Sequence, residues 1–247
     1  MLLRLAAERA TGALLRDRGT LYLVDGQVVH AESPAAPGID VLLTAAGRLR
    51  ADGWTEALRE AGALGKVARY LVDSGRVSGG ELEICHLGAL FDAAFFALAP
   101  NGGPSRFRYG VAHWLGSVRP VPAETIERET VRRRALLDRL WAYPETDTAP
   151  VVRAAQPGCV HAAPRQRAVL DLADGVRTPG DIARALGRPA FHTLIDVRRL
   201  AAAGLVETPR PVAAPLPPPD VARVMETSVD PDVALLRRLR DALEATL

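Results

Sequence analysis

The sequence predicts an α+β protein with two folded regions, and two observations carry this prediction. Near the N-terminus, LYLVDGQVVHA places Asp25-Gly26 between runs rich in Val, Leu and Tyr, which is typical of an antiparallel hairpin with a tight turn. Elsewhere the apolar residues recur mostly at helical spacing, and Gly or Pro often stands at the ends of these periodic segments. A chain of 247 residues has room for two cores.

The first predicted domain covers residues 1–143. A short helix over residues 2–9 precedes the strand GALLRD, which we expect to join the hairpin in a small antiparallel sheet. SRFRYG alternates aromatic and arginine side chains, which predicts a further strand. Helical spacing predicts helices in GIDVLLTAAGRL, WTEALREAG, LGKVARYLVDSG, GGELEICHLGALFDAAFFAL and VPAETIERETVRRRALLDRLW. The most apolar stretch, LGALFDAAFFALAP, is short and contains Asp92, which favours a buried helix over a membrane span.

Three segments of this region resemble the PATAN domain family, small α+β modules of bacterial signalling proteins: TGALLRDRGTLYLVDGQVVHAES, SRFRYG and ERETVRRRALLDRL. The resemblance covers roughly the first 140 residues. It implies an interaction module that brings no catalytic residues. A further segment, LGKVARYLVDSGRVSGGEL, is similar to one copy of a repeat in cyclic-dinucleotide-binding modules of bacterial secretion ATPases, although packing of two helices explains the same spacing.

The second region follows a predicted linker over residues 144–162 and covers residues 163–210. APRQRAVLDLADG predicts a first helix, and Thr178 and Asp181 have the spacing of a capping box before the second helix, DIARALG. A third helix is expected from about Pro189 to Ala203. A short strand at 205–207 would then pair with residues 176–177. This order resembles winged-helix transcription regulators of bacteria, with a truncated wing because PRPVAAPLPPP follows the strand.

The chain is predicted to end in a spacer and a helix. Residues 211–219 form a Pro-rich linker of polyproline character. Residues 220–247 contain DPDVALLRRLRDALEATL, an amphipathic helix with one leucine stripe. The sequence leaves open whether this helix packs within its own chain or across a dimer.

The third helix of the winged-helix domain is the expected DNA-binding element. On a helical wheel, Phe191, Leu194 and Val197 share the arc that should face the other two helices, while Asp196 lies on the opposite, outward arc. Recognition helices present base-reading groups on that outward face. Between Ala163 and Arg210, eight arginines stand against five acidic residues, a local net charge of +3. The predicted DNA-contacting residues are Arg188, His192, Thr193, Arg198 and Arg199.

Motifs for enzymatic chemistry are not found, so we expect no enzyme, no cofactor and no metal site. The five histidines are scattered singly, and Cys85-His86 and Cys159-His161 have no second pair that would complete a zinc site. His30, at the end of the hairpin, would act as a general base only beside a partner that spacing does not reveal. The two distant cysteines and the interrupted N-terminal apolar segment favour a cytoplasmic protein that does not associate with a membrane.

Two functions follow from these features. The first is a homodimeric bacterial transcription regulator that binds DNA through the winged helix and contacts proteins through the PATAN-like domain. The second is an adaptor in a bacterial signalling cluster, of the kind that contains small GTPases and roadblock-type proteins, whose winged helix binds no DNA. The missing wing and the outward Asp196 favour the adaptor, whereas the local net charge favours DNA.

Overall fold

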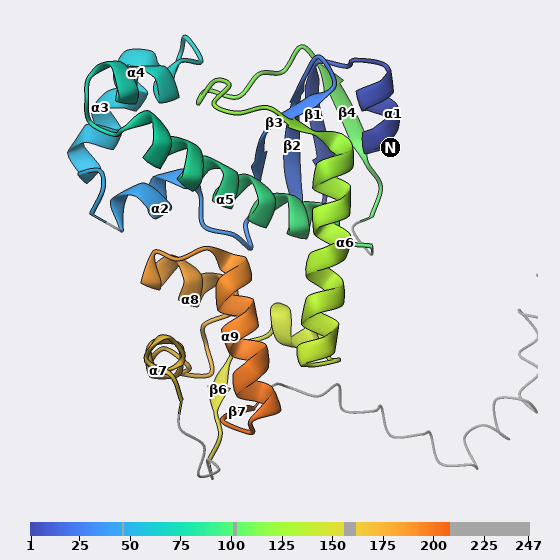
Figure 1. Ribbon diagram of the computed structural model, residues 1–247, viewed down its shortest axis with the longest axis vertical. Coiled ribbons are helices and arrows are strands. Elements are labelled where there is room, and N and C mark those ends of the chain that lie inside the picture. Colours follow the sequence, from blue (N-terminus) through green and yellow to red (C-terminus); the bar gives the residue numbers. More distant parts are fainter. Residues whose placement is uncertain (46, 101–102, 156–161, 208–247) are drawn as a thin grey trace, which may run out of the picture. The chain divides into compact units, whose positions relative to one another are not determined.

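The structure is a computed structural model that describes residues 1–45, 47–100, 103–155 and 162–207 (Figure 1). All of these residues belong to one compact unit, Met1–Pro209. The predicted Pro-rich linker and the predicted C-terminal helix lie outside the described residues, as do Cys159 and His161. No helix among the described residues is long and apolar enough to cross a lipid bilayer.

The first region is built on a five-stranded antiparallel sheet with the strand order β4-β1-β2-β3-β5. The predicted hairpin is confirmed: Asp25 and Gly26 have φ angles of 49° and 79°, the positive values that a tight primed turn requires. The strand expected in SRFRYG is also confirmed, on the edge beside β1. The strands span Gly12–Arg16 (β1), Gly19–Val24 (β2), Gln27–Glu32 (β3), Arg106–Tyr109 (β4) and Val121–Pro122 (β5).

Helices cover this sheet, and the long apolar helix lies directly against it (Figure 1). This helix, α5, begins after a capping box in which Ser78 and Glu81 satisfy each other's backbone N–H groups. It is buried along most of its length, as its composition predicts. Helix α6 runs from the edge of the sheet to the second region (Figure 1). The helices span Leu2–Ala7 (α1), Ile39–Thr44 (α2), Ala51–Ala61 (α3), Val67–Asp73 (α4), Gly79–Ala97 (α5) and Ala123–Leu140 (α6).

The second region contains the three predicted helices and two short strands beside them. We call these helices and strands together the trihelical unit. The predicted capping box is present, because the Thr178 hydroxyl accepts from the Asp181 N–H and the Asp181 carboxylate accepts from the Thr178 N–H. Gly187 ends the second helix in the left-handed conformation. The elements are η1 (Pro144–Asp147), β6 (Val152–Arg153), α7 (Pro164–Asp171), α8 (Pro179–Leu186), α9 (Ala190–Ala202) and β7 (Val206–Glu207).

The pairing of β7 differs from the sequence prediction. We expected residues 176–177 as its partner, but β7 pairs with β6, which comes from the segment that the sequence marks as a linker. Residues 174–177 lie on the other side of this segment, since the Val151 N–H donates to the Arg177 carbonyl. A strand from upstream of the three helices therefore takes the position beside β7 that a wing hairpin would otherwise supply.

Two hydrophobic cores meet at α9. One core lies inside the trihelical unit and contains Val169, Ile182 and Val197. The other lies between the sheet, α5 and α6, and it also takes in Phe191 and Leu194 of α9. The trihelical unit is thus packed on the first region through a shared core. Taken as a whole the fold is α+β, as predicted.

Candidate functional site

The structure separates the five predicted DNA-contacting residues into two groups. His192 and Arg199 are exposed on α9, and Arg188, just before this helix, is half-buried. Thr193 and Arg198 are buried, with 1% and 2% of their surface exposed, so they cannot reach DNA in this arrangement. The helical wheel predicted one buried face on α9, the face toward the other two helices of the unit. In the structure, α6 and η1 cover a second face of α9 that we expected to be exposed.

Arg198 holds α9 against the first region. Its guanidinium makes a two-point ion pair with Asp147 of η1, at 2.8 and 2.7 Å, and also donates to the Trp141 carbonyl. Burial raises the pKa of Asp147, and the hydrogen bonds from Arg198 oppose this rise. Because an unpaired buried charge is costly, Arg198 is a structural residue in this fold.

Asp196 is a second correction to the helical wheel. We expected it to point outward, but it is only 3% exposed and its carboxylate accepts two hydrogen bonds from Arg165 of α7, at 3.1 and 3.0 Å. The neighbouring α7 covers it. Its charge is therefore neutralised locally, and it does not place a free carboxylate between His192 and Arg199.

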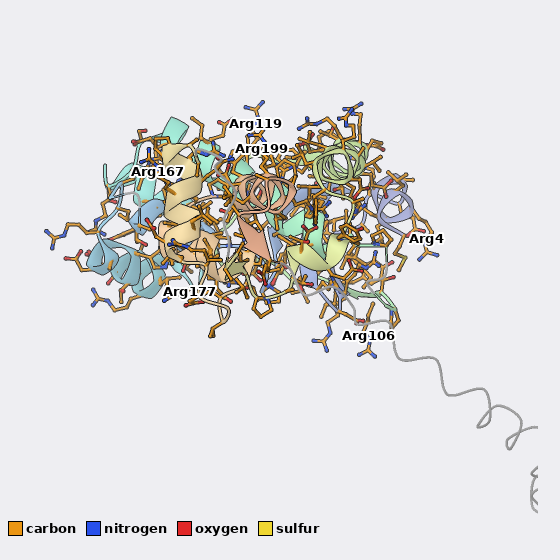
Figure 2. All side chains as sticks on the ribbon, turned by 90° about the horizontal axis from the view of Figure 1, so that it is seen from below. Arg4, Arg106, Arg119, Arg167, Arg177 and Arg199 are labelled. Atoms are coloured by element: carbon orange, nitrogen blue, oxygen red, sulfur yellow. The ribbon has the colours of Figure 1, made fainter. Side chains whose placement is uncertain are left out.

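The consequence is a row of basic groups along α9, which we call the basic strip: Arg188, His192, Arg165 and Arg199. The row is continuous because Arg165 lies on Asp196, and Arg188 donates to the Arg165 carbonyl at 3.3 Å. In Figure 2, Arg199 reaches the surface on the upper side of the view and Arg177 on the lower side. The other aspartates of the trihelical unit pair with arginines: Asp171 with Arg153, Asp174 with Arg177, and Asp181 with Arg184.

The start of α9 is anchored to the first region by Asp92 of α5. The Asp92 carboxylate accepts from the Phe191 N–H at 3.1 Å and from the Arg133 guanidinium at 2.7 Å. Asp92 is 2% exposed, and this burial raises its pKa against the opposing effect of Arg133. Arg133 also lies over the Phe191 ring, 4.4 Å from its centre. One free backbone N–H of α9 is satisfied in this way, and the helix is fixed in place.

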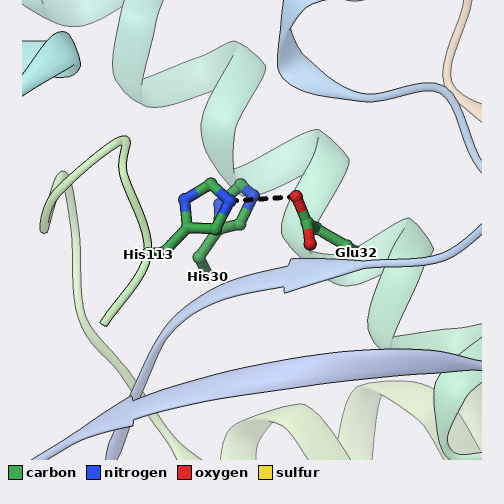
Figure 3. A group of neighbouring side chains, drawn as sticks. All are labelled: His30, Glu32 and His113. Atoms are coloured by element: carbon green, nitrogen blue, oxygen red, sulfur yellow. Dashed lines mark hydrogen bonds and ion pairs between the residues drawn. The ribbon is translucent and has the colours of Figure 1, made fainter. Parts of the chain in front are cut away.

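A second concentration of polar groups lies on the sheet, beside a cavity. His30 and Glu32 come from β3, Tyr22 from β2, His86 from α5, and His113 from the segment between β4 and β5. The three imidazole rings stack in the order His86, His30, His113, with centres 5.5 and 3.9 Å apart. Figure 3 shows the rings of His30 and His113 overlapping, with their edges toward Glu32.

Hydrogen bonds fix the proton positions on two of these rings. The Leu115 N–H donates to Nδ1 of His113, so the proton of this ring sits on Nε2 and is donated to Glu32 at 2.9 Å. Nε2 of His86 donates to the Val29 carbonyl at 2.9 Å, because a carbonyl only accepts. The His113 ring is therefore neutral. Burial lowers the pKa of His86, which favours the neutral ring with its proton on Nε2.

Burial governs the charge state of the remaining groups. Desolvation lowers the pKa of His30 well below its usual value, and the two neighbouring histidines lower it further, so the ring is neutral at pH 7. The hydrogen bond from His113 lowers the pKa of Glu32 and keeps it ionised. Burial and the charge of Glu32 raise the pKa of Tyr22 to about 12, so its hydroxyl donates to Glu32 at 3.1 Å.

His30, Glu32 and His113 are the described residues that come closest to a metal-ligand set, with ligand atoms within 4.8 Å of one another. The arrangement does not suit an ion as it stands. Tetrahedral ligands at about 2.1 Å from an ion lie roughly 3.4 Å apart, whereas the His113 nitrogen and the Glu32 oxygen are 2.9 Å apart and share a proton. Stacked rings also cannot both direct an in-plane lone pair at one point. A metal would require His30 to turn and His113 to lose its proton.

Comparison with protein-family models, with curated proteins and with solved structures finds no match to this chain. The resemblances to the PATAN family and to winged-helix regulators therefore remain resemblances carried by the quoted segments.

The sequence analysis missed the histidine cluster, although part of it had a local signal. In VVHAES, His30 and Glu32 are two residues apart in a strand, which places both side chains on one face of the sheet. His113 has no such signal, because it is 81 residues from Glu32 and its segment is not periodic. His86 lies in the long apolar helix, where the sequence gives no sign of a partner, and it is fully buried.

Proposed function

We propose that this chain is a non-enzymatic, cytoplasmic regulator that binds DNA through the basic strip of the trihelical unit. The PATAN-like region would make the protein contacts, including those of a homodimer. The observation that carries the proposal is the row formed by Arg188, His192, Arg165 and Arg199, within which the one carboxylate is buried and paired. Phosphates are bound by such rows, since each neutralised phosphate releases counterions.

The burial of Thr193 and Arg198 defines the kind of DNA contact that we propose. Positions 188 and 199 are eleven residues apart, which corresponds to roughly 16 Å along a helix axis. A flat row of this length suits contacts to the phosphate backbone more than deep insertion into the major groove. We therefore expect modest sequence preference and a strong dependence on salt.

The test is a fluorescence-anisotropy titration of labelled duplex DNA at 50 and 200 mM salt. If about three phosphates are neutralised, the affinity should fall about 40-fold over this range. Arg199→Ala should weaken binding and reduce the salt slope by about one. Arg106→Ala on β4 is the matched control, because Arg106 is also exposed but lies far from α9 (Figure 2). An affinity that ignores salt and Arg199→Ala would contradict the proposal.

A second function, the protein adaptor, is favoured by a different observation. Helix α9 is packed against α8 on one side and against α6 on the other, so it does not protrude as a recognition helix does. In this case the same face would dock a partner protein within a signalling cluster. Affinity capture from the native host followed by mass spectrometry would identify the partner, and His192→Ala with Arg199→Ala should abolish the capture. The adaptor would be rejected if the double variant still captured the same proteins and the wild-type chain bound DNA in a salt-dependent way.

A further inference from the structure

The histidine cluster borders a cavity of about 360 Å³ between the sheet and the start of α2. This size is within the range of cavities that hold small molecules. His30, Glu32 and Asp40 provide its titratable groups, and Trp114 and Ile39 provide much of its apolar wall. The lining includes two carboxylates and no Lys or Arg side chain. The cavity therefore has the charge of a site for a cation.

The carboxylates retain unused hydrogen-bonding capacity. An ionised carboxylate accepts about four hydrogen bonds, and Glu32 receives two, from His113 and Tyr22. Among the described residues, neither Glu32 nor Asp40 forms an ion pair with Lys or Arg. Both hydrogen bonds to Glu32 come from neutral groups, because the Tyr22 hydroxyl is protonated and Nδ1 of His113 accepts a proton rather than carrying one. The negative charge of the cavity is uncompensated.

His30 is the second, independent indication of a ligand. It lines the cavity, is only 3% exposed, and its Nδ1 atom has no hydrogen-bond partner among the described residues. Buried polar groups are nearly always hydrogen-bonded, so a ring that lines a cavity without a partner indicates that a bound molecule supplies one. The ring nitrogen of His30 that lies on the Glu32 side is Nε2 (Figure 3), and it also forms no hydrogen bond among the described residues. A neutral imidazole offers one lone pair as an acceptor.

We propose that this cavity binds a small primary amine in its ammonium form. An ammonium group has three N–H donors. Glu32 and the lone pair of His30, whose ligand atoms lie within 4.8 Å of each other, accept from two of these donors, and Asp40 adds negative charge to the cavity wall. The carbon chain of the amine lies against Trp114 and Ile39. The indole face adds a favourable contact with the cation.

The cavity also has a direct connection to the trihelical unit. The segment from Ser33 to Gly38 lines the cavity, and within it Ala35 lies against Gly180 of α8, where an added Cβ atom would meet the Ala35 carbonyl oxygen at 2.7 Å. A ligand that orders this segment would act on the position of α8. The binding site itself does not depend on the proposed function, since it is measured without DNA or a partner protein.

The experiment is isothermal titration calorimetry of the full chain with three probes of similar size. Butylammonium carries the charge and three N–H donors, tetramethylammonium carries the charge without donors, and butan-1-ol is neutral. We expect saturable binding of butylammonium, binding of tetramethylammonium that is weaker by about tenfold, and no measurable binding of butan-1-ol. Equal binding of butylammonium and butan-1-ol, or no binding of butylammonium, would overturn the proposal.

Variants locate the binding in this cavity. Glu32→Gln should weaken butylammonium binding about tenfold or more, the loss of one hydrogen bond between charged groups. Asp40→Asn should also weaken this binding, because it removes a negative charge from the cavity wall. Asp40→Asn is the cleaner variant, because the Asp40 side chain makes no hydrogen bond among the described residues. Glu124→Gln on α6, an exposed position, is the matched control. Unchanged binding in Asp40→Asn and Glu32→Gln would overturn the site.

A titration with Zn²⁺ separates an amine from a metal ion. We expect no stoichiometric Zn²⁺ binding, because the His113 nitrogen that faces Glu32 carries a proton. Tight binding of one Zn²⁺ per chain that is lost in His30→Ala, and that excludes butylammonium, would assign the site to a metal and overturn the proposal for an amine.

Discussion

At the scale of single residues, the arginines of this chain divide into those that hold the fold and those that face outward. Arg198 is buried against Asp147 and Arg133 is largely buried against Asp92, whereas their neighbours in sequence, Arg199 and Arg132, are exposed. Adjacent residues of a helix point in different directions, so RR pairs place one guanidinium on each kind of surface. The sequence alone does not tell which of the two is buried.

Glu129 shows how strongly these arginines act on a carboxylate. Arg132 and Arg133 both hydrogen-bond to it, and they lower its pKa from 4.5 to about 2. A carboxylate whose pKa is lowered by folding stabilises the native state above its unfolded pKa, and this contribution is lost as the pH falls through the folded value. We therefore expect Glu129→Gln to be less stable than the wild type at pH 6, with the difference disappearing between pH 4.5 and about 2.

Urea denaturation at several pH values measures this difference in the free energy of unfolding. Glu124→Gln, on the same helix without an ion pair among the described residues, should show no such pH dependence. A stability difference between Glu129→Gln and the wild type that stays constant from pH 6 to pH 2 would contradict the prediction.

At the scale of secondary-structure elements, local signals in the sequence were sufficient. The hairpin at Asp25-Gly26, the capping box at Thr178 and the termination of α8 at Gly187 are properties of a few adjacent residues, and the structure confirms each. What failed were statements about which element packs on which. The pairing of β7 with β6 and the burial of Asp196 depend on chain segments that are distant in sequence, so periodicity does not contain them.

The candidate sites show the same difference between local signals, which the sequence contains, and packing between distant segments, which it does not. His192 and Arg199 are exposed as the helical wheel predicted, although Asp196 of the same arc is covered by α7. Thr193 and Arg198 are buried, because a wheel does not show that α6 covers another arc. The cavity at His30 and Glu32 is completed by Asp40 and Trp114 from other parts of the chain, which only the folded arrangement brings together.

Gly187 allows a prediction at this scale. It has a φ angle of +59°, and an added Cβ atom would collide with the Ala45 side chain beyond α2. Gly75, at the end of α4, has a φ angle of +69° and open space around it. Gly75→Ala should cost about 1 kcal/mol for the left-handed conformation alone. Gly187→Ala should cost clearly more, because it also disturbs the contact with Ala45. Thermal unfolding of both variants measures the loss of stability. Equal losses in the two variants would mean that the contact between Gly187 and Ala45 contributes nothing.

At the scale of the whole molecule, the described chain is one packed body with three hydrophobic cores, two of which share α9. Phe191 and Leu194 belong to the core under the sheet, whereas Val197 and Leu200 belong to the core of the trihelical unit. Asp92 and Arg198 fasten the same helix at its beginning and near its end. The helix that carries the basic strip is therefore the element that joins these two cores.

This arrangement predicts that the two regions unfold together. Trp141 lies at the junction and packs against the core of the trihelical unit, whereas Trp54 and Trp114 lie in the first region. In a chain with Trp54→Phe and Trp114→Phe, the fluorescence of Trp141 should therefore report the same urea midpoint as the far-ultraviolet circular dichroism of the whole molecule. Arg198→Ala leaves Asp147 without its partner, and it should lower both midpoints by the same amount because the junction stabilises both regions. The prediction fails if the chain with Trp54→Phe and Trp114→Phe shows two separate midpoints and Arg198→Ala moves only the fluorescence midpoint. That result would show that the trihelical unit folds on its own and that α9 does not couple the two cores.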